Sequence, residues 1–166
     1  MPIRDATEAD LPAILAITND AIQTTTANWN IRPTTLEARR AWFAERRAAG
    51  FPVLVAEEEG SVRGFASYGP FRAFDGYAQT VEHGLYVARD AQRRGHGAGL
   101  LGGLIARAEA AGLHVMVAGI EAGNAASLAL HERFGFVRVG LMPEVGRKFD
   151  RWLDLVLMQR ILLPVR

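Results

Sequence analysis

Residues 92–99 read Gln92-Arg93-Arg94-Gly95-His96-Gly97-Ala98-Gly99, and this stretch decides the fold. A strand-like run precedes it, and a segment with apolar residues at helical spacing follows it. Glycines at such a junction let backbone amides point into one cavity, and the start of the helix adds partial positive charge. The two arginines add full charges. The stretch therefore predicts a loop that binds a pyrophosphate.

The glycines of this loop fit two sequence patterns, and each pattern predicts a different ligand. Residues 97–102 match the dinucleotide fingerprint G-x-G-x-x-G, and Glu121 follows the next strand, where a ribose-binding carboxylate is expected. The matching glycines, however, fall inside the expected helix and not in the turn after the strand. The other pattern is Q-x-x-G-x-G, met by Gln92, Gly95 and Gly97.

Outward from the loop, periodicity and turn residues divide the chain into alternating elements. Capping signals mark two helix starts, Thr7 with Asp10 and Thr34 with Glu37. The expected helices are a segment from residue 11, then 34–49, 97–111 and 124–134. The expected strands are 3–5, 52–57, 62–68, 78–87, 114–120, 137–144 and 152–161. The strand-helix-strand unit at 78–120 implies one parallel pair in a mixed sheet.

Composition excludes several classes of protein. The 166 residues suit a single domain, 1–166, without an internal repeat or a linker. The absence of cysteine excludes disulfide scaffolds, cysteine-ligated metals and thiolate nucleophiles. A net charge of +1 argues against nucleic acid as a partner. Four scattered histidines suggest no metal site. Without a signal-peptide core or a membrane-length apolar run, we expect a cytoplasmic protein with no membrane partner.

The loop and the segment Asn124–Phe136 together resemble the GNAT superfamily of acetyl-CoA-dependent N-acetyltransferases, over essentially the whole chain. The resemblance implies an α/β fold. Its sheet is mixed and mostly antiparallel, one parallel strand pair is splayed around the cofactor, and helices cover both faces. It also implies acetyl-CoA as co-substrate.

The resemblance assigns residues to that co-substrate. The strand backbone of Leu85, Tyr86 and Val87 would face the pantetheine arm and the acetyl carbonyl. Asn124 would bind the pantetheine, Ser127 shares its helix face, and Arg133 would approach the outer end of the cofactor. The pyrophosphate cradle would comprise Arg93, Arg94, Gly95, His96, Gly97 and Ala98.

Glu82 is the candidate general base. An acceptor amine is an ammonium ion at neutral pH and must lose a proton before it can attack a thioester. Strand alternation places Glu82 on the face opposite His83, unless a bulge intervenes. A carboxylate in a central strand is costly unless it is functional or paired. A structural ion pair for Glu82, and His83 as the base, are the alternatives.

Two neighbouring features point to the acceptor. Arg72 lies between Phe71 and Phe74, and its planar fork suits a carboxylate or phosphinate; the alternative is an exposed loop arginine. Gly84 interrupts the strand, which favours a bulge or a close backbone approach. In a GNAT-like fold this is where the strands separate.

Asn124, Ser127, His131 and Phe134 share one helix face. Many family members carry tyrosine where His131 stands, as the acid for the departing thiolate. Histidine can donate a proton near neutral pH, but a thiolate with a pKa of about 8.5 hardly needs one. The alternative is a helix cap at Asn124 with exposed Ser127 and His131.

Within the superfamily the chain most resembles the phosphinothricin and methionine sulfoximine or sulfone N-acetyltransferases. The matching stretches are 80–83, 85–87, 124–127, 131–133, 148–149 and 151–154. This branch often has serine at the position of Gly84, and it commonly has histidine at that of His131. The resemblance implies an acceptor site made of Arg72, Ala73, Phe74, Glu82, His83 and Gly84, with Trp29, Lys148 and Trp152 as weaker candidates.

The expected activity is therefore direct attack of a small amino-acid-like amine on acetyl-CoA, without an acyl-enzyme. One alternative is an acetyltransferase of the same fold for a protein N-terminus or another amine. A second is a non-catalytic acyl-CoA-binding module. The apolar last strand, residues 152–161, also permits a homodimer.

Overall fold

The computed structural model describes residues 2–163, and its strands form one seven-stranded sheet in the order β1-β2-β3-β4-β5-β7-β6. The strands are β1 (Ile3–Asp5), β2 (Val53–Glu58), β3 (Ser61–Pro70), β4 (Thr80–Val87), β5 (Val115–Glu121), β6 (Val137–Lys148) and β7 (Arg151–Ile161). The α-helices are α1 (Leu11–Thr24), α2 (Leu36–Ala48), α3 (His96–Ala110) and α4 (Ala125–Arg133). Within residues 2–163, no helix is long and apolar enough to cross a membrane.

The topology confirms the element order and the single parallel pair. β4 and β5 run parallel and are joined through α3, and every other neighbouring pair is antiparallel. The predicted N-cap of α2 lies one residue before the observed N-cap. Thr35, not Thr34, caps α2, because its hydroxyl accepts the Ala38 amide while Asn19 holds the amide of Thr34.

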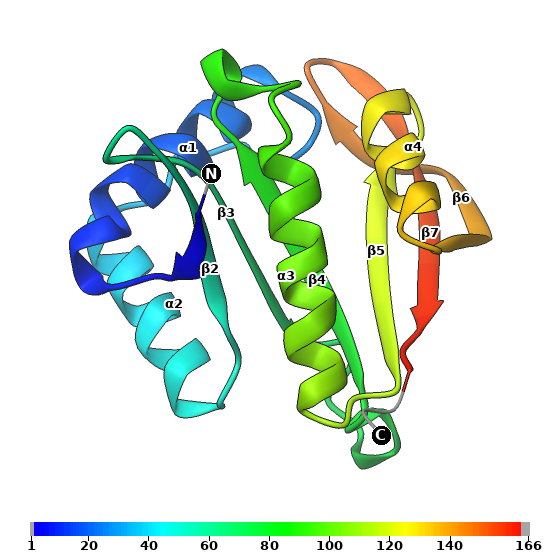
Figure 1. Cartoon of the computed structure of the whole chain (residues 1–166). Helices are drawn as coiled ribbons and strands as arrows, with labels where there is room; N and C mark the ends of the chain where they lie inside the picture. Colours follow the sequence, from blue (N-terminus) through cyan, green and yellow to red (C-terminus); the bar gives the residue numbers. More distant parts are fainter. Residues whose placement is uncertain (1, 164–166) are drawn as a thin grey trace.

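Helices cover both faces of the sheet, as expected (Figure 1). Helices α3 and α4 pack on one face over a core that contains Leu101, Met116 and Leu128. Helices α1 and α2 pack on the other face over a second core, with Ile14 and Phe43. Strand β4 lies in the middle of the sheet. Its side chains therefore reach both cores in alternation.

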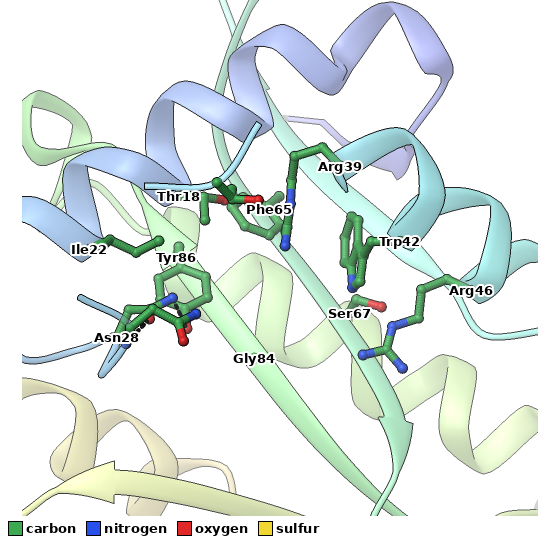
Figure 2. Close-up of a pocket in the computed structure, with 12 residues that line it drawn as sticks. Thr18, Ile22, Asn28, Arg39, Trp42, Arg46, Phe65, Ser67, Gly84 and Tyr86 are labelled. Atoms are coloured by element: carbon green, nitrogen blue, oxygen red, sulfur yellow. Dashed lines mark hydrogen bonds between the residues drawn. The ribbon is translucent and has the colours of Figure 1, made fainter. Parts of the chain in front are cut away.

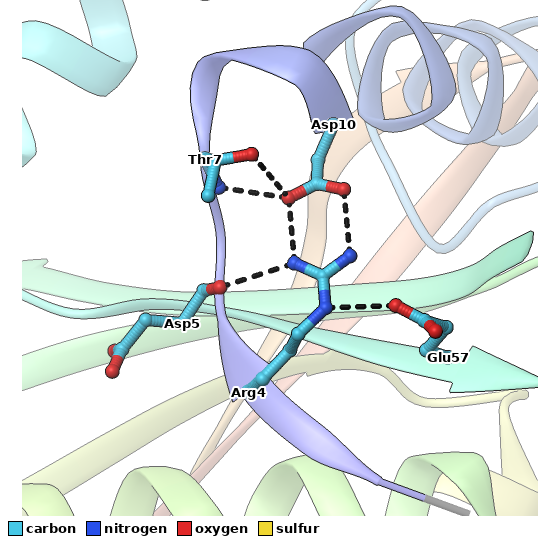
Figure 3. Close-up of polar contacts among 5 residues, drawn as sticks. All are labelled: Arg4, Asp5, Thr7, Asp10 and Glu57. Carbon is cyan, nitrogen blue, oxygen red and sulfur yellow. Dashed lines mark hydrogen bonds and ion pairs between the residues drawn. The ribbon is translucent and has the colours of Figure 1, made fainter. Parts of the chain in front are cut away.

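A cluster of hydrogen-bonded ion pairs around Arg4 holds the N-terminal edge of the sheet in place (Figure 3). The guanidinium of Arg4 donates to both carboxylate oxygens of Asp10, at 2.8 and 2.9 Å, and its Nε donates to Glu57 at 2.8 Å. The amide of Thr7 donates to Asp10 as well, which completes the expected capping box at the turn before α1. Arg4 holds the pKa of the Asp10 carboxyl below its ordinary value. The Arg4 cluster therefore joins β1, the start of α1 and β2.

We expect Asp10→Asn to lower the free energy of unfolding by about 1.5–3 kcal/mol at neutral pH, the range for a hydrogen bond to a charged group. Because the folded pKa of Asp10 is depressed, its contribution is present above the unfolded value of about 3.9 and is lost as the pH falls further. Urea unfolding at several pH values measures this difference, with Glu8→Gln as an exposed control on the same turn. If the difference in unfolding free energy between the wild type and Asp10→Asn stayed constant down to pH 3, the stabilising role of the Asp10 carboxylate would be contradicted.

Candidate active site

Strands β4 and β5 separate in the middle of the sheet. Their pairing covers Thr80–Glu82 against Val115–Val117 and stops there, although both strands continue. Strand β4 keeps an unbroken register with β3 through Gly84, so this glycine marks no bulge in that pairing. A cavity of about 220 Å³ lies at the separation, bordered by Glu82, Gly84 and Gly119 among others. The expected splay of the parallel pair is thus confirmed.

Glu82 lies at this point of separation, on the face that carries α1 and α2. A side chain on Gly119 of β5 would come within 3.4 Å of its Oε1 atom, so the carboxylate lies beside the β5 backbone. Burial raises the pKa of Glu82, and the nearby positive charge of Arg72 opposes that rise. No salt bridge joins Glu82 to another residue of the described part of the chain. Burial of this kind makes a carboxylate a stronger base than an exposed one.

His83 and His131 form a buried pair on the opposite face. Their Nε2 atoms are 2.9 Å apart, and the ring centroids are 5.0 Å apart. The Nδ1 of His131 is 2.7 Å from the carbonyl oxygen of Ser127, and the Nδ1 of His83 is 3.2 Å from that of Val117. Burial lowers the pKa of His131, and burial together with His131 lowers the pKa of His83 to about 3. Both rings are therefore neutral at pH 7.

Proton counting defines the state of this pair. The three contacts need three protons, while two neutral imidazoles carry two. One of the three contacts is therefore left without a proton, and the tautomers of the two rings determine which one. Both ring nitrogens of His131 are thus engaged inside the protein.

The loop between β4 and α3 has the backbone that an anion cradle needs. Arg93 and Gly95 adopt left-handed conformations, with φ of 61° and 89°. Glycine adopts this region without strain, whereas arginine rarely does, so the loop holds Arg93 there at a cost in free energy. Alternation of the backbone in this way turns successive amides toward one side, next to the N-terminus of α3. A cavity of about 470 Å³ runs from this loop to the start of α4.

The side chains of this loop do not all face the cavity. Arg94 donates to Glu58 at 2.9 Å, and the buried ring of His96 has its Nε2 atom 3.6 Å from the same carboxylate. Arg93, Gly97 and His96 border the cavity. Glu58 therefore braces the loop on the side away from the cavity, and Arg94, which is predicted to bind the pyrophosphate, does not border the cavity.

Helix α4 starts at the inner end of the same cavity. Asn124 caps the helix, and its Oδ1 accepts the amide of Ser127 at 3.1 Å. Both residues border the two cavities, at the strand separation and at the loop. Arg133 is exposed at the far end of α4 and borders neither of them. The structure thus brings Asn124 and Ser127 to the site and leaves Arg133 outside it.

A comparison with family models matches residues 14–136 to the acetyltransferase (GNAT) family. The chain belongs to this family. It is an acetyl-CoA-dependent N-acetyltransferase.

Its relatives are similar over nearly the whole chain. An L-methionine sulfoximine/L-methionine sulfone acetyltransferase of Pseudomonas aeruginosa is 57% identical over 99% of this chain and 96% of its own. A phosphinothricin N-acetyltransferase of Alcaligenes faecalis is 42% identical over 95% and 81%.

Two solved structures have the same fold, each with a TM-score of 0.96. An acetyltransferase from Salmonella typhimurium, solved with its cofactor acetyl-CoA, is 50% identical over 98% of this chain and 94% of its own. A ribosomal-protein-alanine N-acetyltransferase from Brucella melitensis is 55% identical over 98% and 100%.

The residues predicted to bind the acceptor begin in the loop after β3. Arg72 is exposed, lies over the ring of Phe71 with its Cζ 4.3 Å from the centroid, and donates to the Phe71 carbonyl. Ala73 is exposed, and Phe74 is 78% exposed. The three residues 72–74 form a rim and not an enclosed pocket.

The three weaker candidates have different environments. Lys148 is buried and donates to the carbonyls of Thr25 and Asn28, and burial lowers its pKa. Trp29 donates to Thr26 and packs over Gly146, where a side chain would overlap the indole. Trp152 is exposed. Lys148 therefore fastens the segment after α1 to the β6–β7 hairpin.

Sequence reasoning missed two parts of this acetyltransferase. The first is Glu58, the last residue of β2, which belongs to an acidic stretch that the sequence predicts to be a solvent-exposed turn. The fold places Glu58 next to Arg94 in the loop before α3. The second is a cavity between α2 and the sheet, which contains two arginines. Neither has a local signal, because the partners are far apart in the chain.

We expect Glu58→Gln to raise the KM for acetyl-CoA about two- to fivefold, with kcat little changed. Partly exposed ion pairs contribute roughly 0.2–1 kcal/mol, and this pair holds the loop and not the reacting atoms. Initial rates at varied acetyl-CoA measure the effect. Glu59→Gln, on the exposed neighbour, is the control and should leave the KM unchanged. An equal change in the two variants would exclude the brace.

Proposed function

We propose that this acetyltransferase acts on the α-amine of a small amino-acid analogue such as methionine sulfone, methionine sulfoximine or phosphinothricin. The observation that carries the proposal is the position of Glu82, a half-buried carboxylate at the strand separation with the charge of Arg72 nearby. The names of the relatives support the substrate class. A single domain over residues 1–166 and a cytoplasmic location stay predictions.

In the proposed mechanism, Glu82 takes the proton from the acceptor ammonium, directly or through a water. The freed amine nitrogen forms a bond to the acetyl carbon, and the bond from that carbon to sulfur breaks, which releases CoA thiolate. The nitrogen then gives its second proton to the thiolate or to water, which leaves the neutral amide and CoA. Backbone amides of Leu85, Tyr86 and Val87 lie beyond the strand separation, where a strand amide can stabilise the developing oxyanion. Arg72, with Ala73 and Phe74, orients the carboxylate of the acceptor.

Glu82 is a better base than His83. His83 is buried, its Nε2 is bound to His131, and a pKa of about 3 leaves it a weak base. Glu82 has a raised pKa and faces the acceptor side. A base is most effective when its pKa approaches the working pH, so the raised carboxyl suits the role.

His131 receives a positioning role. To protonate the thiolate it would have to break its contact with His83 or with Ser127, and a thiolate leaves readily near neutral pH. The pair instead holds the first turn of α4, with Asn124 and Ser127, against β4. General acid catalysis by His131 is the alternative that we proposed from the sequence.

A homodimer is a further proposal. Strand β6, the turn after it and the start of β7 expose a group of large apolar side chains, namely Val137, Val139, Leu141, Met142, Val145, Phe149 and Trp152. A monomer rarely exposes so many apolar side chains together. Sedimentation of the wild type against Trp152→Lys tests the proposal, since a species that stays monomeric at all concentrations would exclude it.

A second candidate function is acetylation of a protein N-terminus, which the name of the Brucella melitensis protein favours. A panel of acceptors separates the two functions: methionine sulfone, methionine sulfoximine, phosphinothricin, spermidine and a short peptide that begins with alanine. We expect CoA release confined to the amino-acid analogues. Turnover only with the peptide or spermidine would keep the fold and reject the acceptor.

We expect Glu82→Gln to lower kcat by about a hundredfold or more, within the range of 10²–10⁴ for general base catalysis. In the wild type, kcat/KM for the acceptor should rise with pH through an acid limb whose midpoint lies above 4.5, since burial raises the pKa of Glu82. The limb should be absent in Glu82→Gln, while affinity for CoA stays the same. Persistence of the limb in the variant would assign the base to another group.

A further inference from the structure

Two arginines of α2 lie on one helix face without an anionic partner. Arg39 and Arg46 make no salt bridge with any residue in the range 2–163, and the Nε atoms of both are buried without a hydrogen-bond partner. Trp42 lies between them, with its ring centroid 4.7 Å from Cζ of Arg39 and 5.9 Å from Cζ of Arg46 (Figure 2). Burial lowers the pKa of both guanidinium groups. The charge of Arg46 lowers the pKa of Arg39 further, while Tyr86 opposes the shift at Arg39 and the neighbouring Glu45 opposes it at Arg46.

The two arginines border a cavity of about 240 Å³ between α2 and the sheet (Figure 2). The rest of its lining is polar or apolar and contains no carboxylate: Thr18, Ile22, Asn28, Asn30, Thr34, Trp42, Phe65, Ser67, Gly84 and Tyr86. Two positive charges therefore face a cavity that offers them no negative charge. Such a cavity suits a group with several oxygen acceptors, because a guanidinium presents a fork of N–H donors.

The cavity adjoins the reaction site. Ser67 and Gly84 are register partners on its floor, and Gly84 and Tyr86 also border the cavity that contains Glu82. Gly69 is the register partner of Glu82, and a side chain there would overlap the guanidinium of Arg46. Two residues of strand, roughly 7 Å, separate Glu82 from Gly84. An acceptor whose amine meets Glu82 can thus extend its side chain toward Arg46.

The two arginine positions suit two ends of one acceptor. Arg72 is exposed on the rim and close enough to act on the pKa of Glu82, and it suits the α-carboxylate next to the amine. Arg46 lies over Gly69, the register partner of Glu82, and Arg39 borders the same partly open cavity. We propose that Arg39 and Arg46 form a subsite for the tetrahedral, oxygen-bearing end of the acceptor side chain: a sulfone, sulfoximine or phosphinate. This inference rests on the proposed function.

Matched acceptors test the subsite. L-Methionine sulfone and L-methionine differ only in two sulfonyl oxygens. We expect Arg39→Gln and Arg46→Gln each to lower kcat/KM for methionine sulfone by tenfold to a hundredfold, and to change that for methionine by less than threefold. Arg72→Gln should lower both values equally. Arg40→Gln, an exposed arginine on the same helix, is the control and should change neither.

Other outcomes overturn the subsite. An equal loss for both acceptors in Arg46→Gln would assign a purely structural role. A decarboxylated amine, 3-(methylsulfonyl)propan-1-amine, should lose activity in Arg46→Gln and not in Arg72→Gln, and the reverse would place the carboxylate in the cavity. If Arg46→Gln does not fold, Arg46→Lys keeps the charge without the fork and should show the same loss of preference for the sulfone.

A binding measurement separates failure of the subsite from failure of the proposed function. If the wild type acetylates none of methionine sulfone, methionine sulfoximine and phosphinothricin, the proposed function fails. The cavity is then tested with sulfate, which should raise the melting temperature of the wild type more than that of the Arg39→Gln/Arg46→Gln double variant at matched ionic strength. Equal shifts in the two proteins would reject the subsite by itself.

Discussion

The whole site depends on the loss of backbone pairing between β4 and β5 after Glu82 and Val117. Buried backbone groups must find partners, so two central strands that diverge leave donors and acceptors that a bound molecule can satisfy. The family uses acetyl-CoA, and the open edge of residues 85–87 is where its acyl arm can take the place of a strand. The loop before α3 and the start of α4 lie at the two ends of this opening, in one continuous cavity.

Strand alternation then divides the chemistry between two faces. Glu82 and Gly84 face α1 and α2, on the side proposed for the acceptor, while His83 faces α4. The carboxyl gains basicity because it is half-buried and makes no ion pair within residues 2–163. The histidine loses basicity because it is desolvated and lies against His131. One residue of register thus separates the proposed base from a ring with a lowered pKa. A bulge at Gly84 would have mixed the two roles, and the pairing with β3 shows none.

Sequence patterns predicted the features that depend on neighbours along the chain. The order of the elements, the parallel pair and the glycine loop all follow from local spacing. The alternative given for Asn124, a helix cap with exposed Ser127 and His131, holds for the cap but not for His131, which is buried. Patterns failed where distant segments meet. Glu58 contacts Arg94 across 36 positions, and Lys148 reaches the carbonyls of Thr25 and Asn28 from the far end of the chain. A cap displaced by one residue, from Thr34 to Thr35, has the same cause, because Asn19 of α1 holds Thr34.

The distribution of charge gives the strongest reason to treat α2 as part of the acceptor side. Elsewhere in residues 2–163 the part-buried arginines face carboxylates: Arg160 donates to Glu109, and Arg63 lies between Glu58 and Asp90. An enclosed guanidinium without a partner costs free energy, since desolvation is not repaid by a counter-charge. Arg39 and Arg46, on either side of the Trp42 indole, each carry this desolvation cost. A leucine or methionine at either position would pack against Trp42 without it, so the two arginines make physical sense when an oxygen-bearing group completes the cavity.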